Sequence, residues 1–197
     1  MLIPLWVLGL DGGVSLAWGQ PPPARELLVG TCEEAESCYR EIWGSLRQRT
    51  SEVSTATKLR QLQVLRERHP SSIWALRAGL LTGVLLMERD PSEALRWLRA
   101  ARRDFPMLDD YLRVWIGEVL LRAGDATAAG AWFESVGEAV PDTLQASRAV
   151  WLAGEAWFRA GQCKRVIEQL APVSKSATLD PAAPAALLSL AECQARE

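Results

Sequence analysis

The chain has 197 residues, of which 49% are hydrophobic and 23% charged, and its formal net charge is -2 at pH 7. This balance is typical of a folded protein and excludes a disordered chain. The charge is uneven, because residues 47–103 carry twelve Lys/Arg against five Asp/Glu, whereas residues 104–197 carry eight against thirteen. The basic segment either solvates the outer side of a helix or binds an anionic partner. Without aromatic residues interleaved along a charged groove, we expect no nucleic acid partner.

The N-terminus has the features of an export signal. Leu2–Leu10 is an apolar run too short to span a bilayer, and Ala17 and Gly19 place small side chains at positions -3 and -1 of a possible cleavage site before Gln20. We therefore predict a signal peptide over 1–19, a proline-rich spacer over 20–30 and a periplasmic or otherwise exported protein. No Lys or Arg precedes the apolar run and an Asp interrupts it, so a buried N-terminal segment of a cytoplasmic protein stays open.

Residues 31–70 are expected to form a first helical hairpin. Thr31 and Glu34 make a capping box before one apolar stripe, and a second stripe ends at His69 and Pro70. The stripes consist of Ala35, Tyr39, Ile42 and Leu46, and then Leu59, Leu62 and Leu65. Because this segment departs from the repeat found downstream, we predict a divergent hairpin that shields one end of a helical stack.

Three prolines each follow an apolar helical stretch at nearly constant spacing. Pro70, Pro106 and Pro141 are 36 and 35 residues apart, which indicates an array of helical repeats. The predicted units are 71–106, 107–141, 142–179 and a truncated 180–197. Each full unit divides into two antiparallel helices, with helix-starting Asp residues and helix-ending glycines such as Gly124 between them. We expect helices over 72–87, 91–105, 109–122, 126–140, 143–159, 163–170 and 182–195.

These units resemble the tetratricopeptide repeat family, a helix-turn-helix repeat with small residues where its helices cross. The matching residues are Gly117, Leu120, Ala129 and Phe133 before Pro141; Leu85, Ala94, Leu98 and Ala101 before Pro106; and Gly154, Trp157, Val166 and Leu170 in the third unit. In the unit before Pro106, Thr82 replaces the small residue. The resemblance implies an all-α, right-handed α-solenoid of antiparallel helix pairs.

Cysteine and tryptophan usage adds two expectations. On one continuous helix Cys32 and Cys38 would face different ways, so a bridge between them requires a break; a Cys163–Cys193 bridge is possible, and buried free thiols are the alternative. Of the nine tryptophans, three recur at packing positions, whereas a fourth is a better candidate for exposure. The three are Trp97, Trp132 and Trp157, and the fourth is Trp151.

Motifs for catalysis are missing from the sequence. His69 is the single histidine, and the chain has no GxSxG, GxxxxGK[ST], GxGxxG or CxxC motif. We therefore predict no catalytic residue, no metal site and no cofactor.

A second, weaker resemblance concerns the helical region of soluble lytic transglycosylases. The amino-acid sequences of residues 109–125 and 147–162 resemble that region. The family's catalytic segment begins Glu-Ser and continues to Gly-Leu-Met-Gln, but no such continuation follows Glu36-Ser37 or Glu134-Ser135. The resemblance thus implies at most a helical region without its catalytic domain, associated with peptidoglycan or with peptidoglycan-processing enzymes.

A repeat stack offers a concave surface made by the first helix of each unit. The family's groove positions fall on Tyr111, Val114, Glu118 and Arg122, and then on Arg148, Trp151, Glu155 and Arg159. Glu118 with Arg122 and Glu155 with Arg159 are also spaced for plain helix-stabilising pairs. We predict a mixed-charge groove for a peptide or protein segment.

The last predicted helix carries Leu187, Leu188 and Leu190 with no partner helix after it. An uncovered apolar face predicts burial by another subunit or by further sequence, including self-association. The resulting expectation is a non-catalytic protein-interaction scaffold of the bacterial cell envelope. The alternatives are the transglycosylase-like helical region and a cytoplasmic adaptor of the tetratricopeptide type.

Overall fold

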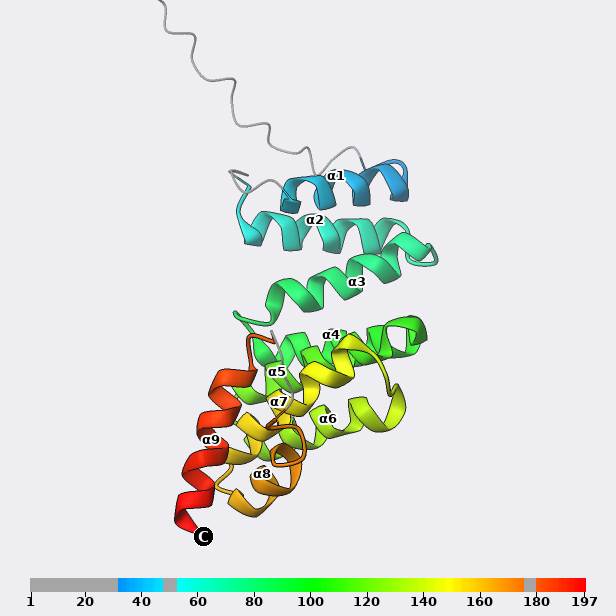
Figure 1. Ribbon diagram of the computed structural model, residues 1–197. Coiled ribbons are helices and arrows are strands. Elements are labelled where there is room, and N and C mark those ends of the chain that lie inside the picture. The colour runs from blue at the N-terminus through cyan, green and yellow to red at the C-terminus, as the bar shows by residue number, and fades with distance from the viewer. Residues whose placement is uncertain (1–31, 48–52, 176–179) are drawn as a thin grey trace, which may run out of the picture. The chain divides into compact units, whose positions relative to one another are not determined.

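The computed structural model describes residues 32–47, 53–175 and 180–197. Within these residues the protein consists of nine α-helices and one short 3-10 helix, with no strand (Figure 1). The prediction of an all-α fold is confirmed. The predicted signal peptide over 1–19 and the spacer over 20–30 lie outside the described residues.

The helices begin and end within a few residues of the predicted positions. Their bounds are α1 Ala35–Arg47, α2 Thr55–Arg68, α3 Ile73–Leu86, α4 Pro91–Asp104, α5 Asp109–Arg122, α6 Ala126–Ala139, α7 Leu144–Arg159, α8 Cys163–Leu170 and α9 Ala183–Arg196. The 3-10 helix Pro106–Leu108, which we did not predict, leads into α5.

Short-range signals explain these boundaries. Five helices have a Ser, Thr or Asp at the N-cap whose side-chain oxygen accepts a hydrogen bond from the backbone N–H three residues later: Ser54, Ser72, Asp90, Asp125 and Thr143. Such a cap satisfies one of the free N–H groups at a helix start. Gly124 and Gly161 have φ values of +88° and +71°, so the left-handed turns that end α5 and α7 favour glycine.

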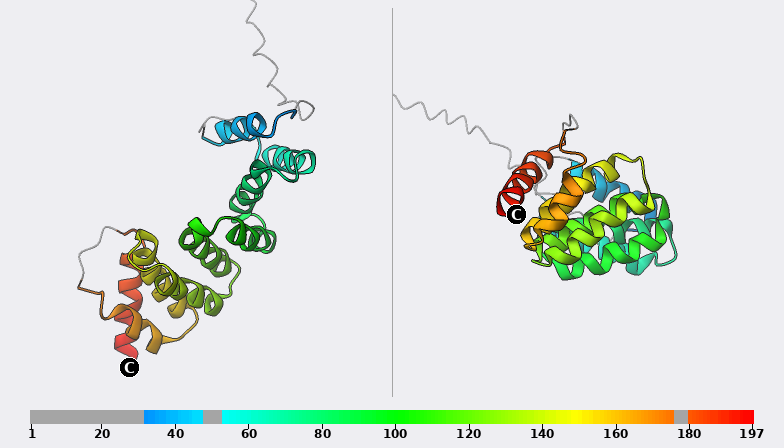
Figure 2. Two further views of the ribbon diagram at one scale, coloured as in Figure 1. Left: turned by 90° about the vertical axis from the view of Figure 1, so that its right-hand side faces the viewer. Right: turned by 60° about the horizontal axis from the view of Figure 1, so that its bottom comes forward.

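Each helix packs against the next one in the chain, so that α3–α4, α5–α6 and α7–α8 form the predicted pairs. Contacts also join α1 with α3, α5 with α7, and α7 with α9, which links the first helices of adjacent pairs. Figure 2 shows α9 lying beside α7 and α8.

Glycine gives the paired helices their close approach. A Cβ atom added to Gly117 would lie 2.5 Å from the ring of Phe133, and one added to Gly154 would lie 2.4 Å from Leu170. Real Cβ atoms do not approach other atoms so closely, so α5–α6 and α7–α8 pack at a distance that only glycine permits. Both glycines were predicted from the family pattern.

In the pair α3–α4 the predicted position of the small residue is wrong. Gly83, not Thr82, faces Leu98, and a Cβ on Gly83 would lie 3.1 Å from that side chain. The segment from this glycine to the N-cap Asp90 is one residue shorter than the corresponding segment from Gly117 to Asp125. Thr82 is buried beside it and donates its hydroxyl to the Ala78 carbonyl at 2.7 Å.

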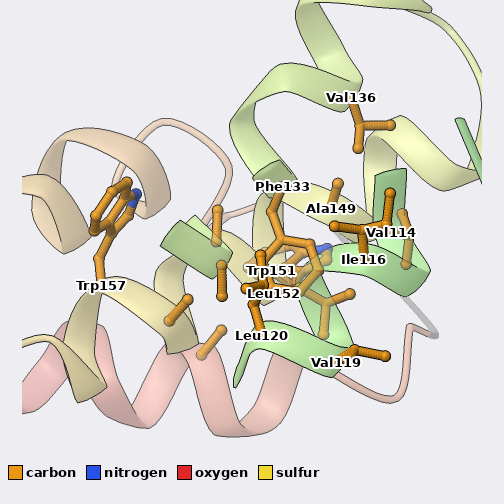
Figure 3. Packing of buried hydrophobic residues seen from close by; sticks show 14 of the residues in the cluster. Val114, Ile116, Val119, Leu120, Phe133, Val136, Ala149, Trp151, Leu152 and Trp157 are labelled. Atoms are coloured by element: carbon orange, nitrogen blue, oxygen red, sulfur yellow. The ribbon is translucent and has the colours of Figure 1, made fainter. Parts of the chain in front are cut away.

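The buried hydrophobic side chains form two clusters. The larger cluster runs from Met87 to Cys193 and includes residues of α4 to α9, and Figure 3 shows side chains of α5, α6 and α7 meeting in it. The smaller cluster consists of Ile42, Leu62, Leu65, Ala78 and Leu81, from α1, α2 and α3. Trp157 belongs to the larger cluster, which confirms its predicted packing role.

The face of α9 that we expected to be uncovered is largely covered. Leu190 is only 5% exposed and Leu187 packs against the larger cluster, while Leu188 remains 63% exposed. The expectation was wrong for Leu190 because α9 rests on both α7 and α8. The main argument for self-association through this helix is thereby removed.

Two disulfide bonds join the four cysteines. Cys163 at the start of α8 is bonded to Cys193 near the end of α9, with a Cα–Cα distance of 5.0 Å. Cys32 is bonded to Cys38 at 5.5 Å, and the break that such a bridge requires is present because α1 begins only at Ala35. In the described part of the chain, no helix has the length and apolar character needed to cross a membrane.

Candidate interaction surface

Six of the eight predicted groove residues lie on the surfaces of α5 and α7. We call them the first-helix strip, and they are Tyr111, Glu118, Arg122, Arg148, Glu155 and Arg159. The prediction for Trp151 was wrong, because this side chain is 4% exposed and belongs to the larger hydrophobic cluster. Val114 is buried as well, since its side chain also faces the neighbouring helices.

An ion pair between neighbouring first helices holds the two halves of the strip together. Arg148 Nη2 of α7 donates to Glu118 Oε1 of α5 at 2.9 Å, although the residues are 30 positions apart. Helix spacing had suggested a pair of Glu118 with Arg122. Within the described residues, Glu118 instead pairs with Arg148. The expected pair of Glu155 with Arg159 is present.

The strip has an aromatic end. Tyr111 is 43% exposed, and its ring lies 6.2 Å from that of Trp115 in an edge-on arrangement. Further exposed apolar residues stand near the starts of the first helices. Ile73, Met107 and Leu144 each precede a closely packed glycine by ten residues, so this exposure recurs in three consecutive pairs.

Arginine and tryptophan also pair between successive second helices, which we did not predict. Arg66 of α2 lies over the ring of Trp97 of α4, with Cζ 3.9 Å from the ring centroid. Arg102 of α4 lies over Trp132 of α6 at 5.4 Å. The sequence contains a signal for this pattern, since the two arginines are 36 residues apart and the two tryptophans 35. Each pair contributes about 0.5–2 kcal/mol where water is partly excluded.

A hydrogen-bonded ionic network connects α4, α5 and α6. Asp109 accepts from Arg102 and, at 2.6 Å, from Arg113, whose Nη1 donates to Ser135 Oγ at 2.9 Å. Burial by itself would raise the pKa of Asp109, but the hydrogen bonds from Arg102 and Arg113 outweigh it and hold the pKa below its usual value. Asp109 is therefore a charged structural contact and not a proton donor at neutral pH.

A groove of about 700 Å³ lies between α2 and α4, with α3 beneath it. Its lining includes three arginines, two glutamates and apolar side chains: Arg60, Arg66, Arg96, Glu67, Glu93, Leu59, Leu86 and Trp97. None of the residues of the first-helix strip contributes to this groove.

Comparison with known proteins adds no identification. No model of a protein family and no curated protein matches this chain. Among the described residues, no group of three or more His, Cys, Asp or Glu side chains is arranged to hold a metal ion. The described residues present two surface features: a mixed-charge strip on the first helices and a groove with three arginines and two glutamates between two second helices.

Proposed function

We propose that the protein is a non-catalytic interaction scaffold of the bacterial cell envelope. Its helix pairs would stack as a right-handed solenoid of the tetratricopeptide type, and its first-helix strip would bind a peptide or protein segment. The observation that carries this proposal is the Glu118–Arg148 ion pair, because it joins polar residues of two repeats into one surface.

The repeated close contacts support the solenoid. Gly83, Gly117 and Gly154 each receive a large side chain from the second helix of the same pair. Contacts of α5 with α7 and of α7 with α9 are those expected where first helices line one surface of a stack. The exposed ring of Tyr111 at one end of the strip is a side chain of the kind that anchors protein partners.

Site-specific photocrosslinking tests the proposed surface. A benzoylphenylalanine at Tyr111 should crosslink a partner in cells, whereas the same group at Lys164 on α8 should not. Arg148→Glu should reduce the crosslink at least tenfold by reversing the charge opposite Glu118, and Lys164→Glu serves as the matched control. Equal crosslinking at both positions would contradict a specific surface. Trp151→Ala is unsuitable, since it would remove a buried side chain and test folding instead.

The proposed compartment has a separate test. Two disulfide bonds are in keeping with an oxidising compartment, because such bonds persist outside the reducing cytosol. Intact mass measurement of the native protein should show loss of residues 1–19 and of four thiol hydrogens. A full-length chain with free thiols would instead favour the cytoplasmic adaptor. Sedimentation with purified peptidoglycan would favour the transglycosylase-like alternative.

A further inference from the structure

The groove between α2 and α4 has the chemistry of a second binding site. Arg60 and Arg66 stand on the α2 wall and Arg96 on the α4 wall, while Leu59 and Leu86 add apolar surface. Its volume of about 700 Å³ falls in the range of about 300–1,000 Å³ that is common for ligand pockets.

Arg66 is the central group of this groove. Its guanidinium lies against the Trp97 ring, and within the described residues no carboxylate forms an ion pair with it. Burial, and next the charge of Arg96, lower the pKa of Arg66, and the carboxylates of Glu67 and Glu93 offset part of this effect. An approaching anion stabilises a partly desolvated cation that lies beside a second cation.

The glutamates of the groove are already engaged. Glu93 accepts hydrogen bonds from Arg96 and, at 2.9 Å, from Trp97 Nε1, all within α4. Glu67 accepts from Gln63 at 2.8 Å. These contacts hold the carboxylates on the walls, where their charges still act on Arg66. Within the described residues no ion pair joins Arg60 or Arg66 to a carboxylate.

From this arrangement we infer that the groove binds an acidic peptide segment, with one carboxylate on Arg66 and aliphatic side chains on Leu59 and Leu86. A planar guanidinium offers donors in the geometry that a carboxylate accepts. Glu67 and Glu93 would repel the dense charge of a polyphosphate or nucleic acid, whereas the separated carboxylates of a peptide avoid them. Arg60 and Arg66 are about 9 Å apart along α2, which is nearest to the ~7 Å between residues i and i+2, whose side chains share one face of an extended peptide.

Fluorescence anisotropy with defined peptides tests this inference on the full chain. The probes are fluorescein-labelled octapeptides with two Glu residues spaced two, three or four positions apart and Leu between them. Twin peptides carry Gln in place of Glu. We expect saturable binding that is strongest at the two-residue spacing, weaker at the three-residue spacing, which places the carboxylates on opposite faces, and at least tenfold weaker for the Gln twins. Absence of saturable binding by every Glu peptide would overturn the inference.

Matched variants separate the site from general charge attraction. Arg66→Gln should weaken binding at least tenfold, while Arg99→Gln, the same change on α4 outside the groove lining, should alter it less than twofold. Circular dichroism checks that both variants fold, and Arg60→Gln replaces the first should it unfold. Equal losses in the groove and control variants would contradict a specific site. Displacement by millimolar pyrophosphate as effective as by unlabelled peptide would show an anion site instead, and peptide-independent dimerisation through the groove would likewise overturn the inference.

Discussion

At the scale of single residues, the most constrained positions are glycines that face large side chains. Gly117 against Phe133 and Gly154 against Leu170 leave no room for a methyl group, so these positions determine how closely paired helices approach. Gly137, by contrast, has no neighbouring heavy atom within 4 Å of an added Cβ and lies in α6. The two kinds of glycine should respond in opposite ways to the same substitution.

Gly117→Ala should destabilise the fold by about 1–3 kcal/mol, because the new methyl group overpacks the contact with Phe133. Gly137→Ala should stabilise it by up to about 1 kcal/mol, since alanine is the better helix former on an open helix face. Urea denaturation followed by circular dichroism measures both changes. A loss of equal size in the two variants would contradict the close-contact explanation.

Asp109 should make stability depend on pH. Its folded-state pKa is lowered, so its contribution to the free energy of unfolding is complete above the unfolded pKa of about 4 and is lost as pH falls through the folded pKa. Asp109→Asn should therefore be less stable than the parent at pH 6, and the difference should shrink towards pH 2. Glu138→Gln, at an exposed position of α6, is the control. A difference that stays constant with pH would argue against the ionic network.

At the scale of elements, α9 is held by packing and by a covalent bond. Ala183, Ala186 and Leu190 are buried, and Cys193 is bonded to Cys163. Because the bridge closes a separation of 30 residues, it restricts the unfolded chain as well as the folded one. The same bond joins α9 to the short α8, and the two helices also pack against each other.

Replacing both Cys163 and Cys193 by Ala should lower the free energy of unfolding by about 2–4 kcal/mol. Hydrogen exchange should show the largest loss of protection in α8 and α9, since these helices lose their covalent connection. The corresponding double replacement of Cys32 and Cys38 should leave exchange in α9 unchanged. Faster exchange spread evenly over all helices would contradict a local role for the bridge.

At the scale of the whole described chain, two hydrophobic clusters share α3. Ala78 and Leu81 belong to the smaller cluster, while Leu80 and Val84 of the same helix pack against the larger one. In arrays where each unit contacts mainly its neighbours, one end can open without the other. The α1–α2 end has the smaller cluster and should open first.

Leu62→Ala should lower the free energy of unfolding of the α1–α2 end by about 2–5 kcal/mol, because it leaves a cavity in the smaller cluster. Hydrogen exchange should accelerate in α1, α2 and the start of α3, with α6 and α7 nearly unchanged. Phe133→Ala in the larger cluster should instead accelerate exchange in α5, α6 and α7. Uniform acceleration in both variants would show a single cooperative unit.

The sequence by itself determined the helices and their pairing. Caps such as Asp125, turn glycines such as Gly124 and the spacing of Pro106 and Pro141 act within a few residues, so they can be recognised without knowledge of distant contacts. The resemblance to the tetratricopeptide pattern identified Gly117 and Gly154 as positions of close approach. Most of the predicted groove residues also lie on the surface. The periodicity of a helix determines which of its residues share one face.

Only the tertiary structure decided which side chains meet across helices. Trp151 proved buried, Glu118 paired with Arg148, and Gly83 took the place assigned to Thr82. A shift of one residue turns a helix position by about 100°, so the residue beside the predicted one faces a different neighbour. The groove around Arg66 could not be predicted from the sequence. Its width depends on the distance between α2 and α4, which both pack against α3.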